Sequence, residues 1–316
     1  MIYVGIDVGG MSIKAGVVDE SGRILHKDSC PTAPERGYEA VIRDIAQLGL
    51  RVIRDSGHAV EEARSIGIGI PGVMDPRTGC ALCNNLYWEN APILEEMRRY
   101  TDLPVYVDND ATVAGLAESV AGVSAGCENS VFITLGTGVG GGVIMNGKVF
   151  SGSHGVATEV GHMTIIEGGE PCNCGKRGCW ERYASATALI REGRRLCGRK
   201  PDAALLKAVD GDPEKITAKH IIDLAKAGDP DCSALFEQYV RYICIGLGNM
   251  INLYDPEVFV LGGGVSYAGD FLLDAVRKEL PNWVFIKSMP YARVELARLT
   301  NDAGIIGAAM LGRKRE

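Results

Sequence analysis

The sequence lacks the long apolar runs and the basic segments that mark membrane and nucleic-acid-binding proteins. No apolar stretch approaches the ~18 residues that a membrane helix requires, and the first residues have neither the basic run nor the continuous apolar core of a signal peptide. Lys and Arg form no run before the last few residues, Arg313 to Arg315, and the formal net charge is −7. We therefore expect a cytoplasmic protein with neither a membrane nor a nucleic acid as partner.

Two familiar nucleotide-binding fingerprints are also missing. No stretch matches the G-K-[ST] end of a Walker A loop. Residues 138–142 read G-V-G-G-G, but a β-branched run follows them rather than a helix. This context argues against the dinucleotide-binding unit of a Rossmann dehydrogenase, in which the glycine loop opens a helix.

The composition favours a compact α/β protein of two domains. The chain has 316 residues, 46% of them hydrophobic, and 41 glycines, which predicts many tight turns. Its ten cysteines come without a secretion signal. Reduced thiols and metal ligation are therefore expected rather than a disulfide framework.

The segment from Glu159 to Glu181 contains four residues with the side chains that tetrahedral zinc prefers: His162, Cys172, Cys174 and Cys179. The three cysteines form a C-x-C-x4-C run, and the histidine lies ten residues before it. A metal that fixes this loop would also fix the two glutamates, so the loop is expected to line a polar site. A purely structural zinc knuckle is the simpler alternative. The pair Cys80 and Cys83 has C-x2-C spacing but no second ligand pair nearby, so no metal is expected there.

Two hairpins with glycine-rich turns occur about 130 residues apart. The first runs from Ile2 through the turn Asp7-Val-Gly-Gly10 to Val18, and the second from Val131 through Gly136-Thr-Gly138 to Met145. A turn without side chains lets backbone N–H groups approach a phosphate closely. An acid beside such a turn, as at Asp7, could hold Mg²⁺ directly or through water. The pair suggests a duplicated architecture with a ligand shared between its halves.

Helices and strands alternate along the rest of the chain, which predicts mainly parallel sheets flanked by helices. The expected helices are 38–56, 93–100, 110–120, 184–197, 218–227 with Thr217 as N-cap, 232–253, 269–280 and 304–311, and the further strands are 65–70, 104–107, 257–261 and 294–297. A domain boundary is expected near residue 120, in the glycine-rich stretch 121–126. This gives a first lobe of residues 1–120, completed by a C-terminal helix over 304–316, and a second lobe of residues 121–303.

Asp108, Asn109 and Asp110 follow a predicted strand and open a predicted helix. Asp108 is expected to be the N-cap of that helix and nothing more. An amide can both donate to and accept from sugar hydroxyls, and a carboxylate can accept the proton of an attacking alcohol. Phosphoryl transfer needs one such base, a metal on the phosphates and donors that neutralise charge, so Asn109 and Asp110 suit a sugar kinase.

These motifs, taken in order, resemble the ROK family of repressors, open reading frames and sugar kinases, within the actin/hexokinase/Hsp70 ATPase superfamily. The resemblance spans essentially the whole chain, and within the family it is strongest to bacterial glucokinases. It rests on seven motifs: Asp7-Val-Gly-Gly10, Gly69-Ile-Pro-Gly72, Asn109-Asp-Ala111, Leu135 to Gly142, Glu159-x-Gly-His162, Cys172 to Glu181 and Leu261-Gly-Gly-Gly-Val265.

The resemblance implies a two-lobed, actin-like or hexokinase-type ATPase fold, with duplicated ribonuclease H-like lobes and a zinc-binding loop. It implies that Asp110 takes the proton from a sugar C6 hydroxyl and that ATP and Mg²⁺ serve as cofactors, with structural zinc on His162, Cys172, Cys174 and Cys179. The implied sugar-binding residues are Gly72, Asn109, Asp110, Glu159, His162 and Glu181. The implied nucleotide-binding residues are Asp7, Gly9, Gly10, Ser12, Lys14, Gly136, Thr137, Gly138, Gly262 and Gly263.

Two positions depart from the family pattern. The usual Thr after D-x-G-G is Met11, which removes a hydroxyl that would face phosphate, and the usual Asn after Asn-Asp-Ala is Thr112. Neither change removes the expected base or the expected zinc ligands.

The expected reaction is ATP-dependent phosphorylation of glucose at its C6 hydroxyl by a homodimer or homotetramer. Kinases of N-acetylmannosamine, N-acetylglucosamine or fructose share the same catalytic residues and are the nearest alternative. A sugar-responsive repressor would need a DNA-binding segment before the first glycine turn, which here begins at residue 9. A catalytically idle sugar sensor is the third alternative, which Met11 keeps open.

Overall fold

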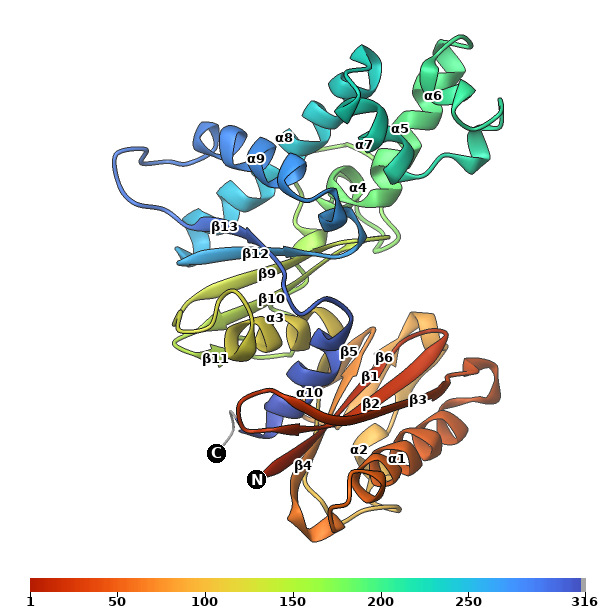
Figure 1. The fold of residues 1–316 in the computed structure, drawn as a ribbon, viewed down its shortest axis with the longest axis vertical. Coiled ribbons are helices and arrows are strands. Elements are labelled where there is room, and N and C mark those ends of the chain that lie inside the picture. Colours follow the sequence, from red (N-terminus) through yellow and green to blue (C-terminus); the bar gives the residue numbers. More distant parts are fainter. Residues whose placement is uncertain (314–316) are drawn as a thin grey trace. The chain divides into compact units, whose positions relative to one another are not determined.

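The computed structural model describes residues 1–313, which form two compact units (Figure 1). Unit 1 comprises Met1–Phe132, Gly142–Thr158 and the described residues from Arg298 onward, and unit 2 comprises Ile133–Gly141 and Glu159–Ala297. The last helix, α10, is described over Ala303–Arg313. Residues 314–316, where the expected C-terminal helix and the basic run end, lie outside the described residues.

The first sheet has five strands in the order β3-β2-β1-β4-β8. The strands span Ile2–Val8 (β1), Ser12–Asp19 (β2), Ile24–Pro31 (β3), Ala63–Ile70 (β4) and Val105–Asn109 (β8). The hairpin β1–β2 is antiparallel, as its glycine turn predicts, while β4 pairs in parallel with both β1 and β8. The carboxyl ends of β1, β4 and β8 therefore lie along one edge of this sheet.

Alternate residues of β1 pack against different helices. Val4 and Ile6 lie in the core beneath α1 (Tyr38–Asp55), whose Gly49 approaches both side chains. Tyr3 belongs to a second core with residues of α3 (Asp110–Ala121) and α10. A Cβ at Gly5 would lie 1.8 Å from the carbonyl oxygen of Ile305, so glycine permits this helix to contact the strand directly.

The second sheet repeats the first, with five strands in the order β11-β10-β9-β12-β13. The strands span Ser130–Leu135 (β9), Val139–Met145 (β10), Lys148–Val149 (β11), Val258–Gly262 (β12) and Arg293–Leu296 (β13). Numbered within each sheet, both orders read third, second, first, fourth, fifth. The duplicated architecture that the two hairpins predict is therefore confirmed.

A small antiparallel sheet was not predicted. It consists of β5 (Val73–Asp75), β6 (Cys80–Cys83) and β7 (Trp88–Ala91), and the short helix α2 (Ile93–Met97) follows it. Cys83 and Trp88 are directly paired and fully buried. The buried residues of this sheet pack against the segment that follows β4.

The remaining helices belong to unit 2. They are α4 (Glu181–Ala184), α5 (Ala186–Arg199), α6 (Ala204–Lys207), α7 (Ala218–Lys226), α8 (Pro230–Tyr254) and α9 (Asp270–Glu279). The expected cap of α7 is confirmed, since the Thr217 hydroxyl accepts a hydrogen bond from the His220 N–H. The helix expected over 184–197 instead starts at Ala186. Its own N-cap, Ser185, accepts from the Ala188 N–H and separates it from α4.

The structure describes no helix that is long and apolar enough to span a membrane. All ten cysteines carry free thiols.

Candidate functional site

The four predicted metal ligands of unit 2 come together. The ligand atoms of His162, Cys172, Cys174 and Cys179 all lie within 4.8 Å of one another. The Cys172 Sγ is 3.5 Å from His162 Nδ1, and the sulfurs of Cys174 and Cys179 are 3.6 Å apart. Three thiols and one imidazole at these separations fit a tetrahedral zinc site. The residues present therefore suit the metal that the sequence predicts.

Two tight turns present the cysteines to this group. The Cys172 N–H donates to the Lys176 carbonyl at 2.9 Å, and the Gly175 N–H donates back to the Cys172 carbonyl at 3.0 Å. Gly175 has φ 87° and Gly178 has φ 78°, values that favour glycine. At Gly178 a side chain is also sterically excluded, because a Cβ would lie 1.6 Å from the Ile166 carbonyl oxygen.

The thiols of the metal group have different acidities. Burial raises the pKa of Cys179 to about 12, while the Lys176 N–H lowers the pKa of the exposed Cys174. A bound cation would favour the thiolate form of each. Cys80 and Cys83 join no comparable cluster among residues 1–313.

His162 presents its two ring nitrogens to different neighbours. While Nδ1 faces Cys172, Nε2 lies 3.9 Å from the Glu159 carboxylate. One ring nitrogen is thus directed to the metal group, and the other is directed toward an acid that is exposed. This division allows one imidazole to serve a metal and a polar ligand at the same time.

Glu181 braces the glycine turn of the second hairpin. Its Oε2 accepts from the Val139 N–H at 3.0 Å, and a Cβ at Gly138 would lie 2.2 Å from that oxygen. Within the turn the Gly136 N–H donates to the Gly138 carbonyl, and the Thr187 hydroxyl donates to the Thr137 carbonyl. The loop that ends at Glu181 is therefore directly tied to a predicted phosphate turn.

The glycines after β12 also lie beside this turn. Gly263 has φ 82°, and a Cβ there would lie 2.7 Å from the backbone of Leu135. Gly262 ends β12 and is buried. Unit 2 thus groups the predicted residues Gly136, Thr137, Gly138, Gly262 and Gly263 around the end of β9.

Asp7 lies near the end of β1, on the face of the sheet covered by α10. Burial raises the pKa of this carboxyl, and the opposing Lys14 on β2 acts in the other direction. A Cβ at Gly304 would lie 2.5 Å from the Asp7 Cγ, so glycine leaves room for the carboxylate. A half-buried acid near a strand end, beside an open glycine turn, is suited to a hydrated divalent cation.

A residue that the sequence analysis overlooked fixes the first glycine turn. Thr32 is fully buried, and its hydroxyl donates to the Gly9 carbonyl at 2.6 Å while its N–H donates to the Met11 carbonyl. The turn itself is closed by the Gly9 N–H, which donates to the Ser12 carbonyl. Met11 is 91% exposed at the tip. Thr32 follows the edge strand β3 and carries no motif, so no local signal identifies it.

Asn109, rather than the predicted Asp108, is the N-cap of α3. Its Oδ1 accepts from the N–H groups of Ala111 and Thr112. Strand β8 continues through Asp108 and Asn109 because these residues pair with Gly69 and Ile70 of β4. The Asp108 carboxylate instead accepts from the Asn109 N–H and from the Ser151 hydroxyl.

The cap also fixes the segment after β4. The Asn109 side-chain amide donates to the Gly72 carbonyl at 3.1 Å. A Cβ at Gly72 would lie 2.6 Å from the Cys83 sulfur, so the buried small sheet holds this glycine close. Asp110, the first residue of α3, has an exposed side chain beside this bond. Unit 1 thus presents Gly72, Asn109 and Asp110 together, on the sheet that carries Asp7.

The comparisons with known proteins identify the family of this chain. The model of the ROK family matches residues 3–315. The glucokinase of Streptomyces coelicolor is 39% identical over 99% of this chain and 98% of its own length. The N-acetyl-D-glucosamine kinase of Haemophilus influenzae is 30% identical over 98% of this chain and 99% of its own. The structure of a ROK family glucokinase from Streptomyces griseus, in complex with glucose and AMPPNP, has a TM-score of 0.81 at 37% identity and covers 99% of this chain and 100% of that one.

Proposed function

The chain belongs to the ROK family, and on that premise we propose that it is an ATP-dependent hexose kinase that forms glucose 6-phosphate from glucose. The observation that carries the proposal is the placement of Asp110. This exposed carboxylate opens α3, next to an asparagine whose own hydrogen bonds fix the local backbone. The similarity to glucokinases over nearly the full chain supports glucose as the first substrate to test.

In the proposed reaction the Asp110 carboxylate accepts the proton of the sugar C6 hydroxyl. The hydroxyl oxygen forms a bond to the γ-phosphorus, the bond between that phosphorus and the β–γ bridging oxygen breaks, and ADP leaves with the released electron pair. Glu159, His162 and Glu181 would bind the other sugar hydroxyls. The N–H groups of the glycine turns would lie along the phosphates.

Two metals accompany the proposal. Mg²⁺ bound with ATP would neutralise phosphate charge, and Asp7 is the residue expected to hold it, directly or through water. Zinc would be held by His162, Cys172, Cys174 and Cys179, where it stabilises the loop between Glu159 and Glu181. These assignments rest on the separations of the ligand atoms and on the position of Asp7 at a strand end.

We further propose a cytoplasmic enzyme that assembles as a homodimer or homotetramer. Ten free thiols favour a reducing compartment. Light scattering after size-exclusion chromatography would measure the assembly, and a monomer would contradict this part of the proposal.

A coupled assay of ADP release tests the activity. We expect purified protein with ATP and Mg²⁺ to turn over glucose faster than mannose, fructose, N-acetylglucosamine or N-acetylmannosamine. A preference for an acetylated sugar would retain the reaction and reassign the substrate, an outcome made plausible by the N-acetyl-D-glucosamine kinase relative. No turnover with any of these sugars, from folded protein that holds zinc, would refute the kinase.

Asp110→Asn tests the proton acceptor. The amide keeps the shape of the side chain but cannot take the proton, so we expect kcat to fall by about 10²–10⁴-fold while glucose binding is partly retained. Asp108→Asn is the control, because an amide can still accept from the Asn109 N–H and donate to the Ser151 hydroxyl. Near-normal turnover of Asp110→Asn would disprove the assignment.

A further inference from the structure

A cavity of about 350 Å³ lies in unit 2 between α4, α5 and α8, apart from the residues assigned above. Its volume is within the range of about 300–1,000 Å³ that is usual for small-molecule sites. One part of the lining is apolar, with Ala188, Leu189 and Tyr239 almost fully buried. Tyr183 and Tyr242 add two aromatic rings, whose centroids are 4.9 Å apart. These two rings give the cavity an aromatic surface against which a ring-shaped ligand could pack.

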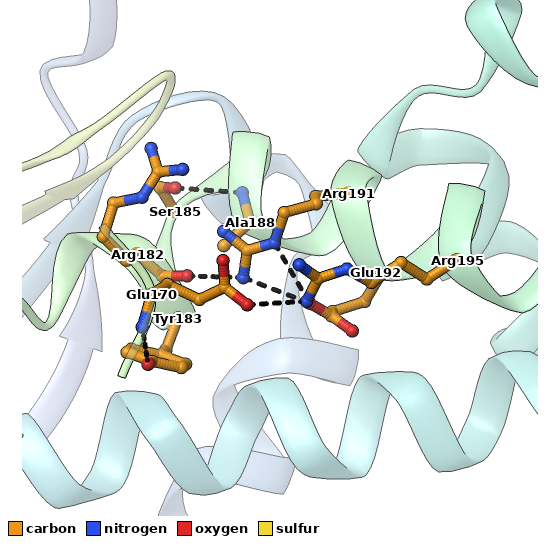
Figure 2. Close-up of polar contacts among 8 residues, drawn as sticks. All are labelled: Glu170, Arg182, Tyr183, Ser185, Ala188, Arg191, Glu192 and Arg195. Carbon is orange, nitrogen blue, oxygen red and sulfur yellow. Dashed lines mark hydrogen bonds and ion pairs between the residues drawn. The ribbon is translucent and has the colours of Figure 1, made fainter. Parts of the chain in front are cut away.

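The polar part of the lining is a connected group of charges (Figure 2). The Arg195 Nη1 donates to Glu170 at 2.7 Å and to Glu192 at 2.9 Å. Arg191 donates through Nε to Glu192 and through Nη2 to the Arg182 carbonyl. Two guanidinium groups of the lining, those of Arg191 and Arg195, thus accompany two carboxylates, so these four charges balance.

The same group has more hydrogen-bond donors than acceptors. The Nη1 of Arg191, a residue of the lining, is buried without a partner among the described residues. Nε and Nη2 of Arg195 also have no hydrogen-bond partner within residues 1–313, and this side chain is 45% exposed. Arginine presents its donors in a planar fork that matches phosphate. Arg195 can therefore receive a phosphate without giving up its bonds to Glu170 and Glu192.

The cavity is connected to the residues that the proposed function assigns to the sugar. Around α4, the Tyr183 hydroxyl accepts from the Glu170 N–H and the Tyr239 hydroxyl donates to the Ala184 carbonyl. Arg191 holds the Arg182 carbonyl from the same side. Glu181 is the first residue of this four-residue helix. A ligand that moves these contacts would shift Glu181 and the glycine turn that it braces.

We propose that this cavity is a second, regulatory site for a small ring compound that carries a phosphate group. The phosphate would lie on Arg195, and the ring would lie against Tyr183 and Tyr242. The regulatory effect rests on the proposed function, whereas binding to the cavity does not. The product of the proposed reaction, a hexose phosphate, is itself a ligand of this class.

Isothermal titration with glucose 6-phosphate tests binding, with saturating glucose and AMPPNP present to fill the catalytic site. We expect about one equivalent to bind the wild-type chain. Inorganic phosphate, an anion without a ring, should bind more weakly. No binding of glucose 6-phosphate would overturn the proposal, and equal binding of the two probes would overturn recognition of the ring.

Four variants decide whether the cavity is the site. Arg195→Gln should weaken glucose 6-phosphate binding about tenfold or more through loss of a charged donor. Gln238→Trp keeps every arginine but places an indole at an exposed lining position. The indole should fill part of the cavity, so this variant should weaken glucose 6-phosphate binding as well. Glu192→Gln should tighten binding because it removes a negative charge while keeping an acceptor. Arg194→Gln is the matched control, on the same helix but bonded to Pro213 and Glu214 outside the cavity. Unchanged binding in both Arg195→Gln and Gln238→Trp would place the site elsewhere and refute the proposal.

The regulatory part has a separate readout. Glucose 6-phosphate should change the KM for glucose more in the wild-type enzyme and in Arg194→Gln than in Arg195→Gln, where only competition by the product at the catalytic site remains. An identical response in all three would overturn the coupling. If no sugar is phosphorylated, the kinase assignment fails, while the titrations still determine whether the cavity binds a phosphate-bearing ring.

Discussion

The two five-stranded sheets share one strand order, but their glycine turns are stabilised in different ways. The turn of β1–β2 is tied to the adjacent edge strand through Thr32, and its tip carries the exposed Met11. The turn of β9–β10 is tied to Glu181, at the end of the cysteine-rich loop. A duplicated framework therefore supplies two similar turns, of which one depends on its own sheet and the other on an inserted loop. The second turn should be more sensitive to damage in that loop.

The largest expected effect comes from removing a metal ligand. Cys172→Ser should lose bound zinc, disorder the loop and displace Glu181 from the second turn, because the folding of small metal sites depends on the metal. Elemental analysis should show about one zinc per chain in the wild type and almost none in the variant, with a large loss of kcat/KM for glucose. Cys80→Ser is the control, since Cys80 belongs to no ligand cluster among the described residues. A folded wild-type protein without zinc would contradict this prediction.

The second prediction compares the two turns directly. Gly138→Ala should displace the Glu181 carboxylate, because a Cβ there would lie 2.2 Å from its oxygen, and the lost hydrogen bond to the Val139 N–H should cost about 0.5–1.5 kcal/mol of stability. Gly10→Ala meets nothing within 4 Å and should leave the melting temperature unchanged. If phosphate lies along the first turn, however, Gly10→Ala should raise the KM for ATP. Equal thermal stability of the two variants would remove the proposed difference between the turns.

The third prediction separates function from stability at Asp7. Burial raises its pKa, so the folded protein holds this proton more tightly than the unfolded chain, and stability falls as the pH rises through the raised pKa. Asp7→Asn mimics the protonated form. It should raise the free energy of unfolding at neutral pH by about 0.5–2 kcal/mol while reducing Mg²⁺-dependent turnover.

Asp28→Asn on β3 provides the opposite control. The Ser29 N–H and Arg51 lower the pKa of this carboxyl. The carboxylate therefore stabilises the folded protein above its unfolded pKa, and this stabilisation is lost as the pH falls. Its neutralisation should slightly lower stability at neutral pH and leave turnover intact. Chemical denaturation of both variants across a pH series would measure whether each substitution raises or lowers the free energy of unfolding. A loss of stability in Asp7→Asn would show that the carboxylate is stabilising.

Features with a local signal could be predicted from the sequence. The hairpins, the long helices α1 and α8 and the cysteine ligands each depend on residues that are close in the chain or regularly spaced. The hairpins and helices form through interactions between residues that are close in the chain, so their sequence patterns predict them. The cysteine ligands are predictable because their spacing is typical of a metal site.

Features that depend on distant pairing could not be predicted. Asp108 looked like a helix cap, but β4 extends the strand by two residues, and the cap therefore falls on Asn109. The small sheet β5–β7 has short strands that are separated by turns, with Tyr87 and Asn90 at positive φ. Thr32 and the cavity beside α4 have no sequence signature, because their partners come from segments far away along the chain.

The smallest expected effect concerns Met11, the residue that most distinguishes the first turn from the family pattern. Because its side chain is 91% exposed, Met11→Thr should not change stability. A new hydroxyl facing phosphate would add one hydrogen bond, so the KM for ATP should fall by about twofold to tenfold. Met11→Val is the matched control, with the same branched shape and no hydroxyl. If both variants lower the KM equally, the bulk of methionine limits ATP binding. If neither does, the first turn holds phosphate through its backbone alone, and in that respect the two turns are alike.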